Sequence, residues 1–188
     1  GGNQGDSPMT KEKKKTGIRP VFASCFLFFA GILVLVIFDQ ISKFLASVYL
    51  KGTEGIVLIP NILKLQYLEN RGMAFGMLQG KQIVFIIFCL VFLGIIFYIF
   101  YRIPKNRYYL PLIVIGAVLA GGAAGNFIDR LVYGYVIDFI YLECIDFPIF
   151  NIADIYVVCG GIALAAVILF RYKDQDFDFL GSGSKRKG

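Results

Sequence analysis

The amino-acid sequence predicts an all-α polytopic membrane protein with four transmembrane helices, a small extracytoplasmic β element and a loop cap. Of its 188 residues, 57% are hydrophobic and only 17% are charged. The mean hydropathy is +0.71, so the chain is far more apolar than an ordinary soluble domain. Four apolar runs each approach the roughly 17–25 residues that a helix needs to cross about 30 Å of hydrocarbon. They cover Val21–Phe38, Ile83–Tyr101, Tyr109–Ala124 and Ile155–Phe170.

Clusters of basic residues beside these runs predict the orientation of the chain. Thirteen of the nineteen basic residues precede the first run, separate the second from the third, or follow the fourth: Lys11, Lys13, Lys14, Lys15, Arg19, Arg102, Lys105, Arg107, Arg171, Lys173, Lys185, Arg186 and Lys187. Lys and Arg accumulate on the cytoplasmic side of membranes. We therefore expect both termini and the 102–108 connection in the cytoplasm, and the connections 44–82 and 125–154 outside. Because the net charge of +6 is explained by orientation, no nucleic-acid partner is expected.

A single membrane domain, residues 18–172, accounts for all four runs. Residues 1–17 are interpreted as a tag remnant followed by a basic cytoplasmic segment, and residues 173–188 as a polar cytoplasmic tail. The first run is not expected to be a cleavable signal peptide, because polar but apparently helical sequence follows it directly.

Short strand-like patterns occur in both outward connections. Val57–Ile59 and the alternation from Leu63 to Tyr67 flank a turn at Pro60-Asn61. In the second connection, Tyr135–Tyr141 is rich in β-branched and aromatic residues. These segments predict a small structured cap on the outer face.

The composition restricts the chemistry that this chain could perform. It contains no histidine, which excludes Ser-His-Asp and Cys-His nucleophile systems and His-ligated metals. Its four cysteines show no C-x-x-C spacing, so a metal cluster is not indicated. We expect no metal and no cofactor, and any acid-base catalysis would depend on carboxylates.

Ionisable residues at membrane depth cost roughly 2.5–3.5 kcal/mol each on insertion scales, so each predicts a partner or a function. Asp39 and Lys43 are spaced i, i+4 and could simply pair on one helix face. Asp129 lies just after the third run, in a stretch that also carries Asn126, and Arg130 could neutralise its carboxylate.

An acid, Asp154, directly precedes the fourth run and could be a first-turn residue behind an Asn151 N-cap. However, Asp129 and Asp154 reach the same depth at the outer interface. Two carboxylates that meet in a partly desolvated setting share a proton, so one acts as a base and the other as an acid. This pair predicts aspartic-protease chemistry, which requires neither histidine nor metal.

Five motifs follow one another along the scaffold. They are Asp39-Gln40-Ile41-Ser42-Lys43, Asn70-Arg71-Gly72-Met73-Ala74-Phe75-Gly76, Gly125-Asn126-Phe127-Ile128-Asp129-Arg130, Val136-Ile137-Asp138-Phe139 and Phe150-Asn151-Ile152-Ala153-Asp154. In order and spacing they resemble the motifs of the bacterial lipoprotein signal peptidases, also called signal peptidase II. The resemblance extends from about residue 18 to about residue 172.

The resemblance implies an intramembrane aspartic endopeptidase of the bacterial cytoplasmic membrane, with its active site on the extracytoplasmic side. The implied substrate is a diacylglyceryl-modified prolipoprotein, cut just before its lipidated cysteine, and the implied catalytic pair is Asp129 and Asp154. The implied supporting residues are Asp39, Lys43, Asn70, Gly72, Phe75, Asn126, Arg130, Asp138 and Asn151. The glycines of the second motif suggest a loop that clamps the substrate. Membrane lipids are expected partners, and since no feature requires an oligomer, we expect a monomer.

Two hypotheses without catalysis compete with this one. A small transporter or ion-relay subunit would use Asp39, Lys43, Asp129 and Asp154 as a relay, but all four lie toward one side of the membrane. A packing scaffold would use the small residues Gly121 and Gly125, but it leaves the clustered Asp and Asn residues without a role.

Overall fold

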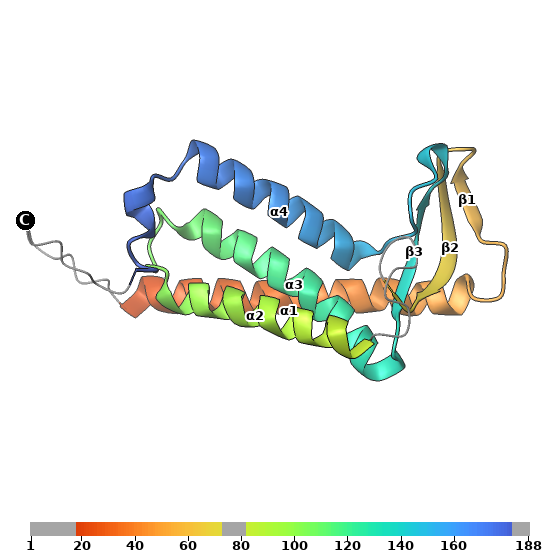
Figure 1. The fold of residues 1–188 in the computed structure, drawn as a ribbon, viewed down its shortest axis with the longest axis horizontal. Helices are drawn as coiled ribbons and strands as arrows, with labels where there is room; N and C mark the ends of the chain where they lie inside the picture. Colours follow the sequence, from red (N-terminus) through yellow and green to blue (C-terminus); the bar gives the residue numbers. More distant parts are fainter. Residues whose placement is uncertain (1–17, 73–81, 182–188) are drawn as a thin grey trace, which may run out of the picture.

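Four long helices form a bundle with a small sheet at one end (Figure 1). The computed structural model describes residues 18–72 and 82–181. The helices are α1 (Ile18–Tyr49), α2 (Gln82–Arg102), α3 (Leu110–Tyr133) and α4 (Ile152–Phe170). Each is long and apolar enough to cross a membrane, which confirms the four predicted spans. α1 and α3 extend beyond the apolar runs because motif residues, among them Asp39 and Asp129, continue the helices.

Three antiparallel strands make up the sheet, in the order β1-β2-β3. They are β1 (Ile56–Ile59), β2 (Leu63–Asn70) and β3 (Val136–Leu142), and a short 3-10 helix, η2 (Glu143–Ile145), follows β3. At the β1–β2 turn Asn61 has a φ of 57°, a left-handed conformation that Asn tolerates better than most residues. The sheet confirms the predicted β element, and the register places Asn70 opposite Val136. The start of the second motif and the fourth motif therefore lie side by side.

α3 is the centre of the bundle and packs against α1, α2 and α4. It ends at Gly134, whose φ of 74° is a left-handed conformation, and whose backbone N–H donates to the Arg130 carbonyl. Gly adopts this conformation without steric cost. The cap reverses the chain directly into β3, so α3 and β3 deliver their acidic residues to the same end of the bundle.

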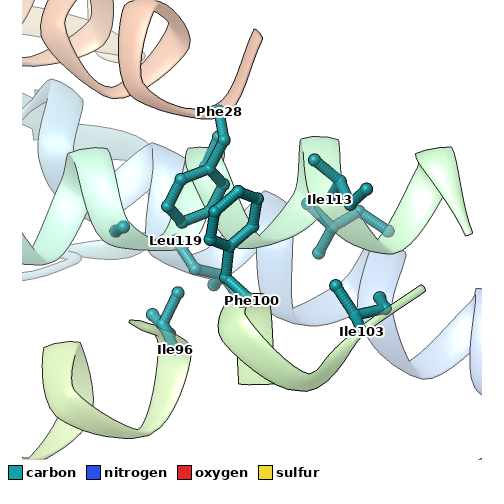
Figure 2. Packing of buried hydrophobic residues seen from close by; sticks show 9 residues of the cluster. Phe28, Ile96, Phe100, Ile103, Ile113 and Leu119 are labelled. Atoms are coloured by element: carbon teal, nitrogen blue, oxygen red, sulfur yellow. The ribbon is translucent and has the colours of Figure 1, made fainter. Parts of the chain in front are cut away.

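The larger buried apolar cluster of the helices lies in the half of the bundle away from the sheet (Figures 1 and 2). There the rings of Phe28 and Phe100 stack with their centroids 3.8 Å apart, and Ile103 and Ile113 pack beside them. Many other large apolar side chains are exposed along the helices, as expected for surfaces that face lipid.

The chain remains packed on the bundle after α4. Tyr172 is buried, and a 3-10 helix, η3 (Asp174–Phe177), follows it. The Tyr109 hydroxyl donates to the Asp176 carbonyl at 2.7 Å. Contacts thus continue beyond residue 172, where the sequence places the end of the membrane domain.

Candidate active site

Lys43 of α1 lies at the centre of a buried polar cluster. Its Nζ is 2.9 Å from Asp39 Oδ2 on the same helix and 2.9 Å from Asp129 Oδ2 on α3. The side chains of all three residues are almost completely buried. The i, i+4 pair expected from the sequence is therefore present, but it is one half of a three-residue ion cluster that joins two helices.

Every carboxylate oxygen of Asp129 has a partner within the protein. Gln40 Nε2 donates to Oδ1 at 2.8 Å. The backbone N–H of Ile137, in β3, donates to Oδ2 at 3.1 Å, and Lys43 also reaches this oxygen. Lys43, and not Arg130, is thus the ion-pair partner of Asp129. The Asp129 side chain, on α3, thus binds both α1 and β3.

Asn126 connects this cluster to the fifth motif, which contains Asn151 and Asp154. Its Oδ1 accepts from Lys43 Nζ at 2.9 Å and from Asn151 Nδ2 at 3.0 Å. Its Nδ2 donates to Asp154 Oδ1 at 2.8 Å. Because both ends of the amide are used, its orientation is fixed, and it separates the Asp129 cluster from Asp154.

Asp154 is held at the start of α4 by a capping box with Asn151. The Asp154 backbone N–H donates to Asn151 Oδ1 at 3.0 Å, and the Asn151 backbone N–H donates to Asp154 Oδ2 at 3.1 Å. This is the structural alternative that the sequence offered for both residues, and it stabilises the helix end. It also fixes the direction of the Asp154 carboxylate, so the cap does not exclude a catalytic role.

Asp138 of β3 lies against the same Asn151. Asn151 Nδ2 donates to Asp138 Oδ1 at 2.6 Å, and Asn70 Nδ2 donates to Oδ2 at 2.8 Å. Burial, reinforced by the charge of Asp154, raises the pKa of Asp138 to about 7, against the opposing effect of its hydrogen bonds with Asn70 and Asn151. Asp138 is therefore poised to hold a proton near neutral pH.

Two acidic residues thus share Asn151 as a hydrogen-bond partner. The backbone N–H of Asn151 contacts Asp154 and its side-chain amide contacts Asp138. The contacts of Asp129 run instead to Gln40, Lys43 and Ile137. Among the residues described, Asp138 is the carboxylate that these contacts bring beside Asp154.

One face of this site opens into a cavity of about 440 Å³ between α2, α3 and α4. Asp154, Asn126 and Arg130 supply its polar lining, and the rest is mainly apolar. Arg130 Nη1 donates to the Asn126 carbonyl at 3.2 Å, and its guanidinium lies 5.1 Å from the centre of the Phe85 ring. A peptide that enters this cavity would meet a carboxylate and a cation at one end.

The second motif is described only in part. Asn70 Oδ1 accepts from the backbone N–H of Gly72 at 3.0 Å, and Gly72 is buried. Asn70 thus links this turn to Asp138. Phe75 and the clamp expected around Gly76 lie outside the described residues.

Some residues of the site were absent from the predicted set. Gln40 binds both Asp39 and Asp129. Gly125 leaves room for Asp39, because a Cβ at this position would collide with its carboxylate. The first and third motifs contain these residues, but the sequence indicated only a helix-packing role for Gly125 and no role for Gln40. No group of three or more His, Cys, Asp or Glu residues that could hold a metal ion occurs in residues 18–72 and 82–181.

The chain is similar to known proteins over most of its length. A family model described as "Signal peptidase (SPase) II" matches residues 31–170. A lipoprotein signal peptidase from Caldanaerobacter subterraneus subsp. tengcongensis is 40% identical over 138 residues, which cover 73% of this chain and 92% of that protein. One from Streptococcus pyogenes serotype M5 is 36% identical over 151 residues, or 80% of this chain and 96% of that one.

The fold is also similar to that of a solved protein. A bacterial membrane enzyme structure obtained by the in meso method superposes with a TM-score of 0.70 at 32% identity. The match covers 82% of this chain and 93% of the solved chain.

Proposed function

The chain belongs to the signal peptidase II family, and on that premise we propose that it removes signal peptides from prolipoproteins with Asp138 and Asp154 as its catalytic pair. The chain is thus a membrane peptidase, for which a carboxylate pair supplies the chemistry. The observation that carries the pairing is the position of Asn151, which donates to both carboxylates. The comparisons do not favour the transporter hypothesis.

Each carboxyl group suits a different role. Asp138, with a pKa of about 7, is the protonated member and hydrogen-bonds the scissile carbonyl oxygen. Asp154, which accepts N–H donors on both oxygens, is the ionised member and takes a proton from the attacking water.

In the first step the water oxygen bonds to the carbonyl carbon while its proton passes to Asp154 and the Asp138 proton passes to the carbonyl oxygen. In the second step the C–N bond breaks, Asp154 gives its proton to the leaving nitrogen, and the tetrahedral hydroxyl proton returns to Asp138. The pair is thereby restored. Asn126 and Arg130 are positioned to orient the substrate and to stabilise developing charge.

Asp129, which the sequence favoured as the partner of Asp154, becomes a positioning residue in this proposal. It binds the backbone N–H of Ile137, the residue directly before Asp138. Lys43 and Gln40 hold it from α1. Asp129 would therefore act through the placement of β3. Asp39 and Lys43 belong to the same ion cluster on α1, and Asn70 supports Asp138 directly from β2.

The proposed substrate is a prolipoprotein with a diacylglyceryl-modified cysteine, cut just before that cysteine. The lipid chains and the apolar part of the signal peptide would stay in the bilayer while the scissile bond reaches the sheet end of the helices. We place this end on the extracytoplasmic side, with both termini in the cytoplasm, and propose that the enzyme works as a monomer among membrane lipids.

The test is the cleavage of a diacylglyceryl-modified prolipoprotein by purified Asp138→Asn, Asp154→Asn and Asp129→Asn proteins. We expect the first two to fold and lose cleavage. We expect Asp129→Asn to unfold at a lower temperature, with its folded fraction still cleaving. Cleavage by a folded Asp138→Asn protein, together with none by a folded Asp129→Asn protein, would restore the Asp129 pairing.

The pH profile adds a second readout. The active pair carries one proton, which Asp138 releases as the pH rises through about 7. Above this pH, kcat/KM should fall about tenfold per pH unit. The Asp129→Asn protein should show the same decrease over the same pH range. The folded protein keeps this proton to a higher pH than the unfolded chain, in which the pKa of Asp138 has its ordinary value of 3.8. The free energy of unfolding therefore also falls as the pH rises from about 4 to about 7. Rates are therefore compared per folded molecule, and a profile that stays flat to high pH would contradict the assignment.

A further inference from the structure

An apolar groove follows α3 between α2 and α4. Both helices pack against α3 but have little direct contact with each other, and α3 lies between them in Figure 1. The cavity that contains Asp154 occupies the sheet end of this groove. A second cavity, of about 530 Å³ and almost wholly apolar, occupies the other end. Phe92 of α2 lines both cavities, so the two cavities adjoin at this side chain.

The far end of the groove is closed by residues 171–181, called here the C-terminal cap. Phe177, Phe179 and Leu180 line the apolar cavity. The cap is tied to the start of α3 by the hydrogen bond from Tyr109 to Asp176, and to the end of α2 by Arg102 Nη2, which donates to the Gly181 carbonyl at 3.3 Å. The C-terminal cap thus connects α2 and α3 at the end of the bundle away from the sheet (Figure 1). It also lies beyond residues 31–170, which the family model matches.

We propose that this groove holds the apolar stretch of the signal peptide, and that the C-terminal cap limits how long this stretch can be. The proposal rests on the proposed function, which supplies the substrate. From Asp154 to Phe170, α4 rises about 24 Å. Signal peptides carry an apolar stretch of about 7–15 residues, which as a helix is about 10–22 Å long. A stretch of this length fits between Asp154 and the cap, whereas a longer one meets Phe177 and Phe179.

Charge supports the same orientation of the signal peptide, with its scissile bond at Asp154 and the start of its apolar stretch at the C-terminal cap. Asp174, exposed at the edge of the cap, is the charged residue that lines the far cavity. The segment before the apolar stretch of a signal peptide is positively charged. With the scissile bond at Asp154, that basic segment reaches the end of the groove where Asp174 lies.

The experiment measures kcat/KM for diacylglyceryl-modified prolipoprotein peptides whose apolar stretches contain about 11, 15 or 19 residues, each step being about one helical turn, or 6 Å. For the wild-type protein we expect kcat/KM to fall at least about tenfold from the middle to the longest peptide. In Phe177→Ala and Phe179→Ala proteins we expect that fall to shrink to less than about threefold. Leu180→Ala serves as a third variant if either aromatic change lowers the unfolding temperature.

Phe170→Ala is the matched control, because Phe170 is 89% exposed at the end of α4 and does not line the cavity. It should keep the length preference of the wild type. The same length preference in the wild type and in all cap variants would overturn the proposal. So would a wild type that cleaves all three peptides equally.

A photo-crosslinker at the inner end of the apolar stretch tests binding without turnover. Crosslinks to residues 171–181 support the proposal. Crosslinks confined to other surfaces overturn it, because the signal peptide would then bind elsewhere and leave the groove to lipid chains. Failure of the proposed function is a separate outcome, in which the wild type cleaves no peptide of any length. The crosslink still decides the occupant of the groove in that case.

Discussion

Lys43 places one ammonium group against three acceptors. Its Nζ lies 2.9 Å from a carboxylate oxygen of Asp39, from one of Asp129, and from the amide oxygen of Asn126. The side chain is 2% exposed, so water cannot replace these contacts. Two buried carboxylates therefore depend on a single cation.

Replacing Lys43 with Met should lower the free energy of unfolding by about 3 kcal/mol, because the removal of one partner leaves buried charge uncompensated. Cleavage should fall with the folded fraction. Unfolding of the detergent-solubilised protein measures the stability.

Lys51→Met is the matched control. Lys51 also pairs with a carboxylate, that of Glu69, at 2.9 Å, but both side chains are accessible to water. Exposed ion pairs contribute little, so no measurable change in stability is expected. An equal loss of unfolding free energy in the two variants would mean that burial does not make the Lys43 ion cluster more important for stability than an exposed ion pair.

At the scale of elements, the approach of α1, α3 and α4 depends on Gly125. A Cβ at this position would collide with the Asp39 carboxylate and would lie 3.3 Å from the Ala153 Cβ on α4. Asp39 in turn accepts from the Ala153 backbone N–H at 3.0 Å. The small residue thus allows a buried hydrogen bond between α1 and α4 across the face of α3.

Gly125→Ala should therefore destabilise the protein by about 1–3 kcal/mol, the usual cost of overpacking. Gly161→Ala provides the contrast, since a Cβ there meets nothing within 4 Å. Ala is favoured over Gly inside a helix by about 0.5–1 kcal/mol, so this variant should be slightly more stable than the wild type. Unfolding temperatures that move in the same direction for both variants would contradict the close-packing argument.

The elements themselves were predictable because each has a local signal. Apolar runs of membrane length predicted the helices, and the alternation around Pro60-Asn61 predicted β1 and β2. The pairing of acidic residues had no such signal. Asp129 and Asp138 both lie near the sheet end of the bundle, and the Gly134 cap turns the chain so that Asp138, in β3, reaches Asn151. Because α3 continues past Asp129, that residue faces α1 and Lys43, while β3 carries Asp138 to Asn151.

At the scale of the whole molecule, two ends with different chemistry are separated by apolar helices. The sheet occupies one end, and the 102–108 connection and the C-terminal cap occupy the other (Figure 1). The carboxylates of Asp129, Asp138 and Asp154 cluster at the sheet end. The basic residues Arg102, Lys105 and Arg107 all lie at the second end. A chain inserted by the positive-inside rule would therefore expose the sheet end to the outside, where exported proteins arrive.

This orientation can be read from cysteine labelling. Cys144 is exposed in η2 beside the sheet, whereas Cys25, Cys89 and Cys159 lie within the spanning helices, which a charged reagent does not enter. A membrane-impermeant maleimide should label Cys144 in intact cells, and Cys144→Ala should abolish the signal. A cysteine introduced in the Cys144→Ala protein by Asn106→Cys, at an exposed site of the opposite connection, should react only after the membrane is permeabilised. The reverse pattern would invert the proposed topology and place the carboxylate pair on the cytoplasmic side.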